Sequence, residues 1–290
     1  MRGWWQDLTD LVLPTDCAGC GAPRTTLCPR CRTALAGGAP RRVRPLPKPP
    51  GLPAVYASAP YAEVVRALLL AHKERGALTL TGALGAALAG AVRAGLGGPA
   101  GAFGVPGTVV LVPVPSARWA VRARGHDPVR RMALAAAGEL RRTGTPARVA
   151  AVLRQRRPVA DQAGLDAPRR LANLAGALEI AKGGERLLGG GRVVLVLVDD
   201  LVTTGATLAE AARALREGTV LCRERGNGPT RPVYENATRE GREERQTGTR
   251  PEKGKWVHGA VKNAVVNALG APSYAAVIAA PRDTFEIAGN

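Results

Sequence analysis

The sequence contains few aromatic residues, few histidines and no P-loop. Tyr, Trp and Phe make up 3% of the 290 residues, and there are three histidines. His72, His126 and His258 do not have the spacing of metal ligands, so a histidine-based metal site is not expected. Because neither GxxxxGKS nor GxxxxGKT occurs, a Walker-type nucleotide site is excluded.

Uninterrupted apolar runs of membrane-spanning length are also absent. Arg, Lys or Glu breaks each candidate run, whereas a transmembrane helix needs about 20 consecutive apolar residues. Residues 1–13 do not have the pattern of a secretory signal, because Asp7 and Asp10 interrupt the apolar stretch and no small-residue cleavage site follows. We therefore interpret residues 1–13 as a short amphipathic helix, and we expect a cytoplasmic protein without membrane insertion.

What the chain does contain is apolar residues and positive charge. Hydrophobic residues make up 46% of the sequence, which is enough to form a core and argues against global disorder. The formal net charge of +18 favours anionic partners such as phosphorylated metabolites or nucleic acid. A general arginine bias with solvated faces explains the same total charge equally well.

Four of the five cysteines form two CxxC pairs near the N-terminus. Thiols stay reduced in the cytoplasm, so the pairs Cys17/Cys20 and Cys28/Cys31 predict a metal site rather than disulfides. Four thiolates complete the tetrahedral coordination of Zn²⁺, which predicts a structural site. Zinc knuckles also bind nucleic acid, but no aromatic residue is interleaved here for base stacking. We expect the site mainly to hold the N-terminal segment together, with DNA contact as the alternative, and we interpret the fifth cysteine, Cys222, as a free thiol.

The rest of the chain alternates between strand-like and helix-like segments. Residues 1–36 form the four-cysteine module, and residues 37–53, with six prolines, form a linker. Residues 54–290 alternate strands and helices, which predicts an α/β domain with a mostly parallel twisted sheet flanked by helices. Residues 218–258 are polar and mixed in charge where a short connection is usual, so we interpret them as a flexible insertion.

The strongest local signal is a hydrophobic strand that ends in two carboxylates and a turn of small and hydroxyl residues. Residues 193–198 are all Val or Leu, and Asp199 and Asp200 follow them. The turn that leads into the next helix offers backbone N–H groups for a phosphate, and the carboxylates can accept hydrogen bonds from ribose hydroxyls. Helix capping alone would explain one threonine but not the whole pattern. The predicted binding residues are Asp199, Asp200, Thr203, Thr204, Gly205, Ala206 and Thr207.

The stretch Val198 to Thr207 closely resembles the phosphoribosyl-diphosphate (PRPP) motif of type I phosphoribosyltransferases. Over nearly the whole chain except residues 218–258, the sequence resembles the ComF family, which pairs a four-cysteine module with such a domain. Besides the PRPP motif, the matching pieces are Cys17-Ala18-Gly19-Cys20, Cys28-Pro29-Arg30-Cys31, Ala71-His72-Lys73-Glu74-Arg75-Gly76, Val112-Pro113-Val114-Pro115, Arg124-Gly125-His126-Asp127 and Gln162 to Asn173.

The resemblance implies a type I phosphoribosyltransferase fold that binds PRPP with Mg²⁺. It assigns the ribose hydroxyls to Asp199 and Asp200 and the 5′-phosphate to the turn 203–207. It places Pro115 and Ser116 in the pyrophosphate loop, with Arg118, Arg122 and Arg124 near enough to neutralise diphosphate. The implied reaction transfers phosphoribosyl to an acceptor that the sequence does not identify, and no catalytic residue is assigned.

The chain departs from one branch of the family pattern at Thr203. Oxopurine salvage enzymes of this fold have an acidic residue at this position to handle the purine proton. Its absence argues against oxopurine salvage, while orotate-type enzymes tolerate a threonine. The departure mildly favours the alternative implied by the resemblance, a non-catalytic protein acting in DNA uptake (competence) or regulation, and fold alone does not decide between the two.

Further basic residues have two interpretations each. The segment 154–165 resembles the mobile loop of these domains and would form a cationic lid over diphosphate; a solvated basic loop is the alternative. Lys73 is either a second phosphate contact or a helix C-terminal cation followed by a glycine cap at Gly76, and the capping interpretation has the firmer physical basis.

Overall fold

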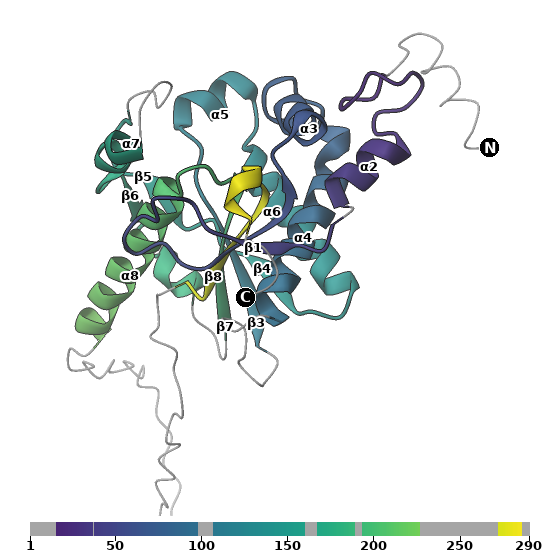
Figure 1. Ribbon diagram of the computed structural model, residues 1–290. Coiled ribbons are helices and arrows are strands. Elements are labelled where there is room, and N and C mark those ends of the chain that lie inside the picture. Colours follow the sequence, from purple (N-terminus) through teal and green to yellow (C-terminus); the bar gives the residue numbers. More distant parts are fainter. Residues whose placement is uncertain are drawn as a thin grey trace, which may run out of the picture.

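The chain folds into a six-stranded sheet with helices on both faces (Figure 1). Beside it lies a two-stranded antiparallel pair, called the hairpin below, whose strands are joined through a helix. This computed structural model describes residues 16–36, 38–97, 107–159, 167–188, 193–226 and 272–285. The helices are α2 (Pro29–Ala36), α3 (Glu63–Glu74), η1 (Leu78–Leu80), α4 (Thr81–Gly97), α5 (Arg118–Arg124), α6 (Pro128–Arg142), α7 (Ala167–Leu174), η3 (Gly184–Leu187), α8 (Ala206–Gly226) and η4 (Arg282–Thr284). The strands are β1 (Arg41–Val43), β2 (Val55–Pro60), β3 (Thr108–Pro113), β4 (Ala147–Val149), β5 (Leu153–Gln155), β6 (Leu178–Ile180), β7 (Val193–Leu201) and β8 (Tyr274–Ala280).

The main sheet has the strand order β1-β2-β8-β7-β3-β4. Strands β2, β8, β7, β3 and β4 run parallel, whereas β1 pairs antiparallel with β2. In the centre, Val109 of β3 pairs with Val194 of β7, and Val198 pairs with Ala276 of β8. Continuous Val and Leu runs are typical of parallel strands covered on both faces. The predicted mostly parallel α/β sheet is therefore confirmed.

Two apolar clusters lie on opposite faces of the sheet. On one face, α3, α4 and α6 contribute buried side chains such as Leu68, Leu88 and Leu140. On the other face, α8 and the hairpin β5–β6 contribute Leu208, Leu215 and others. Figure 1 shows α8 and the hairpin on the side of the sheet away from α4. Removing this apolar surface from water on both faces is the main stabilising contribution to the fold.

Helix α4 is apolar because it is a core helix. With η1 it forms the single stretch of described residues, Leu78–Gly97, that is long and apolar enough to cross a membrane. Its backbone lies against β8: a Cβ on Gly95 would be 2.2 Å from the ring of Tyr274. The hydroxyl of Tyr274 also donates a 2.7 Å hydrogen bond to the carbonyl of Val92. The close approach to the sheet explains both the apolar composition and the glycine.

The N-terminal module packs directly on the α/β domain. Cys17, Cys28, Cys31 and Leu35 belong to the same apolar cluster as the buried residues of α3 and α4. Residues 37–53, interpreted from the sequence as a linker, contribute β1 to the sheet and bury Val43 and Leu52 in the second cluster. The module is therefore joined to the domain by a shared core as well as by the chain.

Helix α8 continues to Gly226, past residue 218, where we expected a flexible insertion to begin. Its continuation packs on the hairpin, because a Cβ on Gly218 would lie 2.4 Å from Cδ1 of Ile180. The segment expected to be an insertion thus begins inside a helix. Residues 227–258, and the helix expected at 1–13, lie outside the described residues.

Candidate functional site

The candidate site lies where two neighbouring strands lead the chain in opposite directions. From β3 the chain passes through α5 and α6 to β4, and from the adjacent β7 it passes through α8 to β8 on the other side. Open α/β sheets bind ligands in the crevice that such a switch point creates at the carboxyl ends of the strands. The structure brings the predicted residues 115–116 and 199–207 to the carboxyl ends of these two adjacent strands, the former after β3 and the latter at the end of β7.

Asp199 and Asp200 come directly before Leu201, the last residue of β7, and both are buried. The N–H of Asp200 donates to Oδ1 of Asp199 over 2.8 Å. Burial raises the pKa of Asp199 well above its usual range, and the neighbouring charge of Asp200 adds to this effect. Burial also acts to raise the pKa of Asp200, but the charge and hydrogen bond of Lys73 outweigh burial and lower it. Asp200 therefore ionises at a lower pH than Asp199, although the two carboxyls are adjacent.

The turn after β7 has the conformation and composition of an anion-binding loop. Gly205 has φ +77°, a left-handed conformation that side chains rarely adopt. The N–H of Ala206, the first residue of α8, lies 3.4 Å from Oγ1 of Thr204, so a threonine does contact the helix start. A side chain at position 205 would point toward residues 45–52. Its Cβ would be 2.9 Å from Cδ2 of Leu52 and 3.5 Å from Cγ of Pro45. The segment expected to be a linker therefore lies against the predicted phosphate turn.

Lys73 lies at this site because α3 ends there. Its Nζ is 2.9 Å from Oδ2 of Asp200. Burial acts to lower the pKa of Lys73, but the charge and hydrogen bond of Asp200 outweigh it, so the pKa is raised. The interpretation of Lys73 as a helix C-terminal cation is consistent with its place in the last turn of α3. Sequence reasoning missed the ion pair, because no local pattern relates residues 73 and 200.

Two of the motif pieces that carry the family resemblance contact each other beside Lys73. Arg124 donates two hydrogen bonds to the carboxylate of Glu74, at 2.7 and 2.8 Å. The rings of His72 and His126 meet edge to face with centroids 5.9 Å apart. Because Arg124 is paired with Glu74, its charge is already partly compensated, unlike the exposed side chains of Arg118 and Arg122. The three arginines proposed to neutralise diphosphate are thus not equivalent.

The segment 154–165, expected to be a lid, begins inside β5 of the hairpin β5–β6, and β6 follows it after α7. Arg154 pairs with Glu179 across the hairpin at 2.8 Å. Arg157 donates to the carbonyls of Asn173 and Ala175 at 2.8 and 2.9 Å, at the end of α7. Residues 160–166 lie outside the described residues, so the lid interpretation stays a prediction. Arg157 in this structure satisfies helix-end carbonyls.

Glu210 of α8 holds this hairpin in place. Its buried carboxylate accepts from the N–H of Leu178 at 2.9 Å, and Arg213 donates to the same carboxylate and to the carbonyl of Leu178. Burial acts to raise the pKa of Glu210, but hydrogen bonds from Arg213 and Leu178 outweigh burial and lower it. The start of β6 is therefore tied by a side-chain network to α8, the helix that begins at the candidate site.

Replacing Glu210 by glutamine is expected to lower the free energy of unfolding at neutral pH by about 1.5–3 kcal/mol, because charge-assisted hydrogen bonds are lost. In the native protein this contribution is present above the unfolded carboxyl pKa and is lost as the pH falls through the lowered folded pKa. Hydrogen exchange at the Leu178 amide, with urea unfolding, measures the effect. Glu63→Gln on the exposed start of α3 is the control, and an equal loss there would contradict the role of Glu210.

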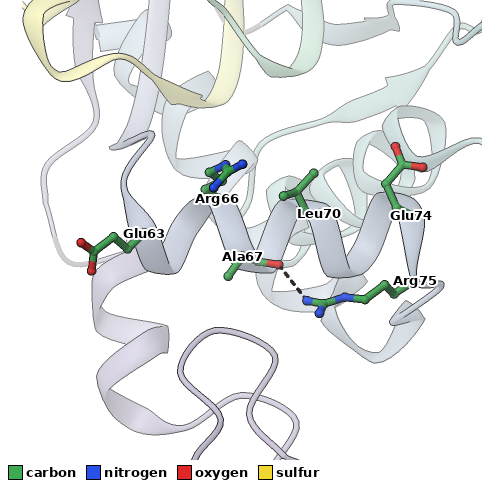
Figure 2. Close-up of a pocket in the computed structure, with 6 residues that line it drawn as sticks. All are labelled: Glu63, Arg66, Ala67, Leu70, Glu74 and Arg75. Carbon is green, nitrogen blue, oxygen red and sulfur yellow. Dashed lines mark hydrogen bonds between the residues drawn. The ribbon is translucent and has the colours of Figure 1, made fainter.

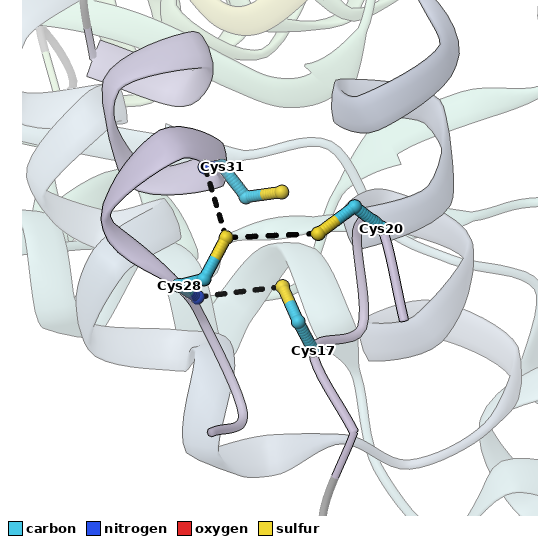
Figure 3. A group of neighbouring side chains, drawn as sticks. All are labelled: Cys17, Cys20, Cys28 and Cys31. Atoms are coloured by element: carbon cyan, nitrogen blue, oxygen red, sulfur yellow. Dashed lines mark hydrogen bonds between the residues drawn. The ribbon is translucent and has the colours of Figure 1, made fainter. Parts of the chain in front are cut away.

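The four cysteines of the two CxxC pairs meet at one point (Figure 3). Their sulfur atoms all lie within 4.8 Å of one another, and the Sγ atoms of Cys20 and Cys28 are 3.6 Å apart. Tetrahedral Zn²⁺ with bonds of about 2.3 Å would place its sulfur ligands about 3.8 Å apart, so the cluster could hold such an ion. A Cβ on Gly19 would lie 2.8 Å from Sγ of Cys31, which explains the glycine inside the first pair.

Backbone N–H groups point at two of these thiols. The N–H of Cys28 donates to Sγ of Cys17 at 3.3 Å, and the N–H of Cys31 donates to Sγ of Cys28 at 3.4 Å. Burial acts to raise the pKa of Cys17, but these and neighbouring N–H groups lower it to about 6. Burial and the other three thiols raise the pKa of Cys31. The pKa values of Cys17 and Cys31 are thus shifted in opposite directions within one group of four close sulfur atoms, and a bound cation would stabilise the thiolate forms.

A separate surface groove lies on the outward side of α3 (Figure 2). It has a volume of about 420 Å³ and is lined by Arg66, Leu70, Glu74 and neighbouring residues. Arg75 folds back along the helix and donates to the carbonyl of Ala67 at 3.5 Å. Neither Asp199 nor Asp200 lines this groove, so it is distinct from the candidate site.

Comparison with protein-family models and with curated proteins gave no match to this chain. The resemblance to the ComF family therefore depends on the motifs within the chain alone. The structure shows an α/β domain with a mostly parallel sheet and a four-cysteine cluster, which is compatible with that resemblance.

Proposed function

We propose that the residues at the carboxyl ends of β3 and β7 bind PRPP and that the protein transfers its phosphoribosyl group to an acceptor. The observation that carries the proposal is the position of Asp199 and Asp200. They lie just before the end of a buried strand at the switch point of the sheet, and a short turn with the left-handed Gly205 connects this strand to the N-terminus of α8. A sugar with vicinal hydroxyls and a phosphate matches both halves of this arrangement.

Each part of the site has a distinct task in this proposal. The carboxylates accept hydrogen bonds from the ribose hydroxyls, and the N–H groups of the turn 203–207 and of the start of α8 hold the 5′-phosphate. Residues Pro115 and Ser116, partly exposed after β3, would contact the diphosphate. Mg²⁺ would neutralise the diphosphate and assist its departure. With Thr203 in place of an acid, the chain offers no carboxyl at that position to handle a purine proton.

The test is Mg²⁺-dependent binding and turnover of PRPP by the full-length chain. Calorimetry with and without Mg²⁺ measures binding, and diphosphate release with a panel of nucleobases measures transfer. Saturable binding with diphosphate release for one acceptor supports the proposal. A folded protein that does not bind PRPP at millimolar concentration contradicts it.

We also infer that zinc occupies the four-cysteine cluster and that its role is structural. Four thiolates leave no open coordination position, so Cys17, Cys20, Cys28 and Cys31 would hold the ion without exposing it to a substrate. The shared apolar core of the module and α3 supports a structural role. Elemental analysis of protein purified under reducing conditions tests for one zinc per chain.

A second candidate function is a non-catalytic one in DNA uptake, and one observation favours it. Trp119 is 72% exposed at the start of α5, and it is the only aromatic side chain with such exposure among the described residues. Arg118 and Arg122 on the same helix are also exposed. An exposed aromatic ring with neighbouring guanidinium groups is a surface on which single-stranded nucleic acid stacks and binds.

Trp119→Ala is expected to weaken binding of a short single-stranded oligothymidine by about tenfold, because stacking contributes roughly 1–3 kcal/mol per base. Fluorescence anisotropy with a labelled oligonucleotide at fixed salt measures the affinity. The control is Leu134→Ala, which removes a side chain that is 52% exposed on α6. If both variants bind like the wild type, or if the wild type does not bind, this surface does not serve in DNA binding.

A further inference from the structure

Lys73 is placed so that it acts on Asp200. Its ammonium donates to Oδ2 of Asp200 across 127 positions in sequence. The side chain of Asp200 is 11% exposed, whereas that of Lys73 is 34% exposed. A pair of adjacent buried carboxylates without a counter-charge would not remain doubly ionised at neutral pH. Lys73 therefore provides a charge partner that the aspartate pair needs in the absence of ligand.

Four other charged or titratable groups lie near Lys73 and Asp200. From β7, Asp199 lies next to Asp200; from α3 come His72 and Glu74, and Arg124 from α5 faces Lys73. Glu74 is compensated by Arg124 through two hydrogen bonds. Burial lowers the pKa of His72 to about 4, with smaller contributions from His126 and Arg131, so His72 is neutral at physiological pH. The ammonium of Lys73 is the cation that directly contacts the aspartate pair among the described residues.

The end of α3 that carries Lys73 is held by His126. Nε2 of His126 is 3.2 Å from the carbonyl of His72, and its Nδ1 is 3.1 Å from the carbonyl of Arg124. These carbonyls belong to the last turns of α3 and α5, so one buried ring contacts the ends of both helices. Nε2 of His72 in turn lies 3.0 Å from Oγ1 of Thr81. Together with the Glu74–Arg124 pair, these contacts fix the backbone on which Lys73 is placed.

We propose that Lys73 is a positioning residue: it holds the Asp200 carboxylate charged and oriented toward the ribose hydroxyls, and it does not contact the phosphates. The α3–α5 junction around His126 fixes Lys73 in that role. The proposal rests on the function proposed above for its ligand, but the contact that carries it is present without ligand. It resolves the two sequence-based interpretations of Lys73 in favour of a third, in which the lysine acts through an aspartate.

The experiment compares Lys73→Met with Lys73→Arg in the full chain. Selective ¹³C labelling of aspartate carboxyls follows the titration of Asp200, and Asp200→Asn identifies its signal. Lys73→Met is expected to move the titration of Asp200 to higher pH, while Lys73→Arg keeps it near the wild type. Arg66→Met, an equal charge change at an exposed position of the same helix, is the control and should leave it unmoved.

The second arm measures affinity for two probes, PRPP with Mg²⁺ and inorganic diphosphate with Mg²⁺. Lys73→Met should weaken PRPP by about tenfold or more, as expected when a charge-assisted contact loses its orientation, and leave diphosphate within about twofold. Equal weakening of both probes would show a direct phosphate contact and overturn the proposal.

The remaining outcomes are also decisive. An unchanged Asp200 titration in Lys73→Met overturns the role of Lys73 even if affinity falls. His126→Phe removes both carbonyl contacts and should move the Asp200 titration in the same direction by a smaller amount, whereas no movement would remove His126 from the proposal. If the wild type binds no PRPP, the proposed function fails, and the carboxyl titration still decides whether Lys73 controls Asp200.

Discussion

Replacement of Gly205 by valine is expected to abolish PRPP binding. Gly205 has φ +77°, a conformation that is unfavourable for a β-branched residue by roughly 1–2 kcal/mol. The new side chain would also approach Leu52, because a Cβ there lies 2.9 Å from its Cδ2. Relief of either strain moves the N–H groups that would surround the phosphate, and a helix N-terminus binds an anion only when those groups point at it.

Calorimetry with PRPP and Mg²⁺ measures the loss, and thermal unfolding shows whether the fold survives. Thr207→Ala is the matched variant within the turn, and it should reduce affinity by about tenfold or less because only one hydroxyl is lost. Leu52→Ala makes room beside Gly205 without changing the turn and should leave the affinity within about threefold of the wild type. A Gly205→Val protein that is folded and binds PRPP normally would show that the turn is not the phosphate site.

Replacement of Cys31 by serine is expected to prevent binding of the zinc ion proposed above and to destabilise the whole chain by at least about 3 kcal/mol, because structural metal sites contribute directly to folding free energy. Cys31 is fully buried and belongs to the same apolar cluster as Leu68 and Leu88. Without the ion, Cys17 and Cys28 stay buried with no metal to bind, and we expect the loosened module to uncover part of the face of α3.

Elemental analysis and chemical unfolding of the same preparation test this prediction. The control is Cys222→Ser, which removes the cysteine outside the two CxxC pairs. Metal content should fall only in Cys31→Ser, together with the unfolding midpoint. A metal-free wild type with the same stability would contradict the structural role of zinc.

The sequence predicted those parts of the structure that depend on local pattern. The run of Val and Leu at residues 193–198 identified β7, because a strand covered on both faces needs apolar residues at every position. The CxxC spacing identified the ligand cluster, because each pair lies within one turn of chain. Both features can be recognised from about ten consecutive residues or fewer at a time.

Contacts between distant segments could not be predicted in the same way. The pair Lys73–Asp200 depends on where α3 ends relative to β7, and the pair Glu74–Arg124 depends on how α3 packs beside α5. The strand in residues 37–53 was missed because proline-rich sequence has no period-2 pattern, and its three residues pair only because β2 offers an open side. These contacts depend on how whole helices and strands pack against one another. A single sequence does not show that packing.

The short strand β1 has a consequence for truncation of the chain. Arg41, Arg42 and Val43 cover the hydrogen-bonding edge of β2, which is otherwise a buried and apolar strand. An uncovered edge of this kind pairs readily with another copy of itself and leads to aggregation. A fragment that begins at residue 54 would lose this cover together with the residues that pack beside Gly205. The proline-rich segment thus covers the sheet edge and prevents its pairing with a second copy. A truncation that is meant to isolate the α/β domain should therefore begin before residue 41.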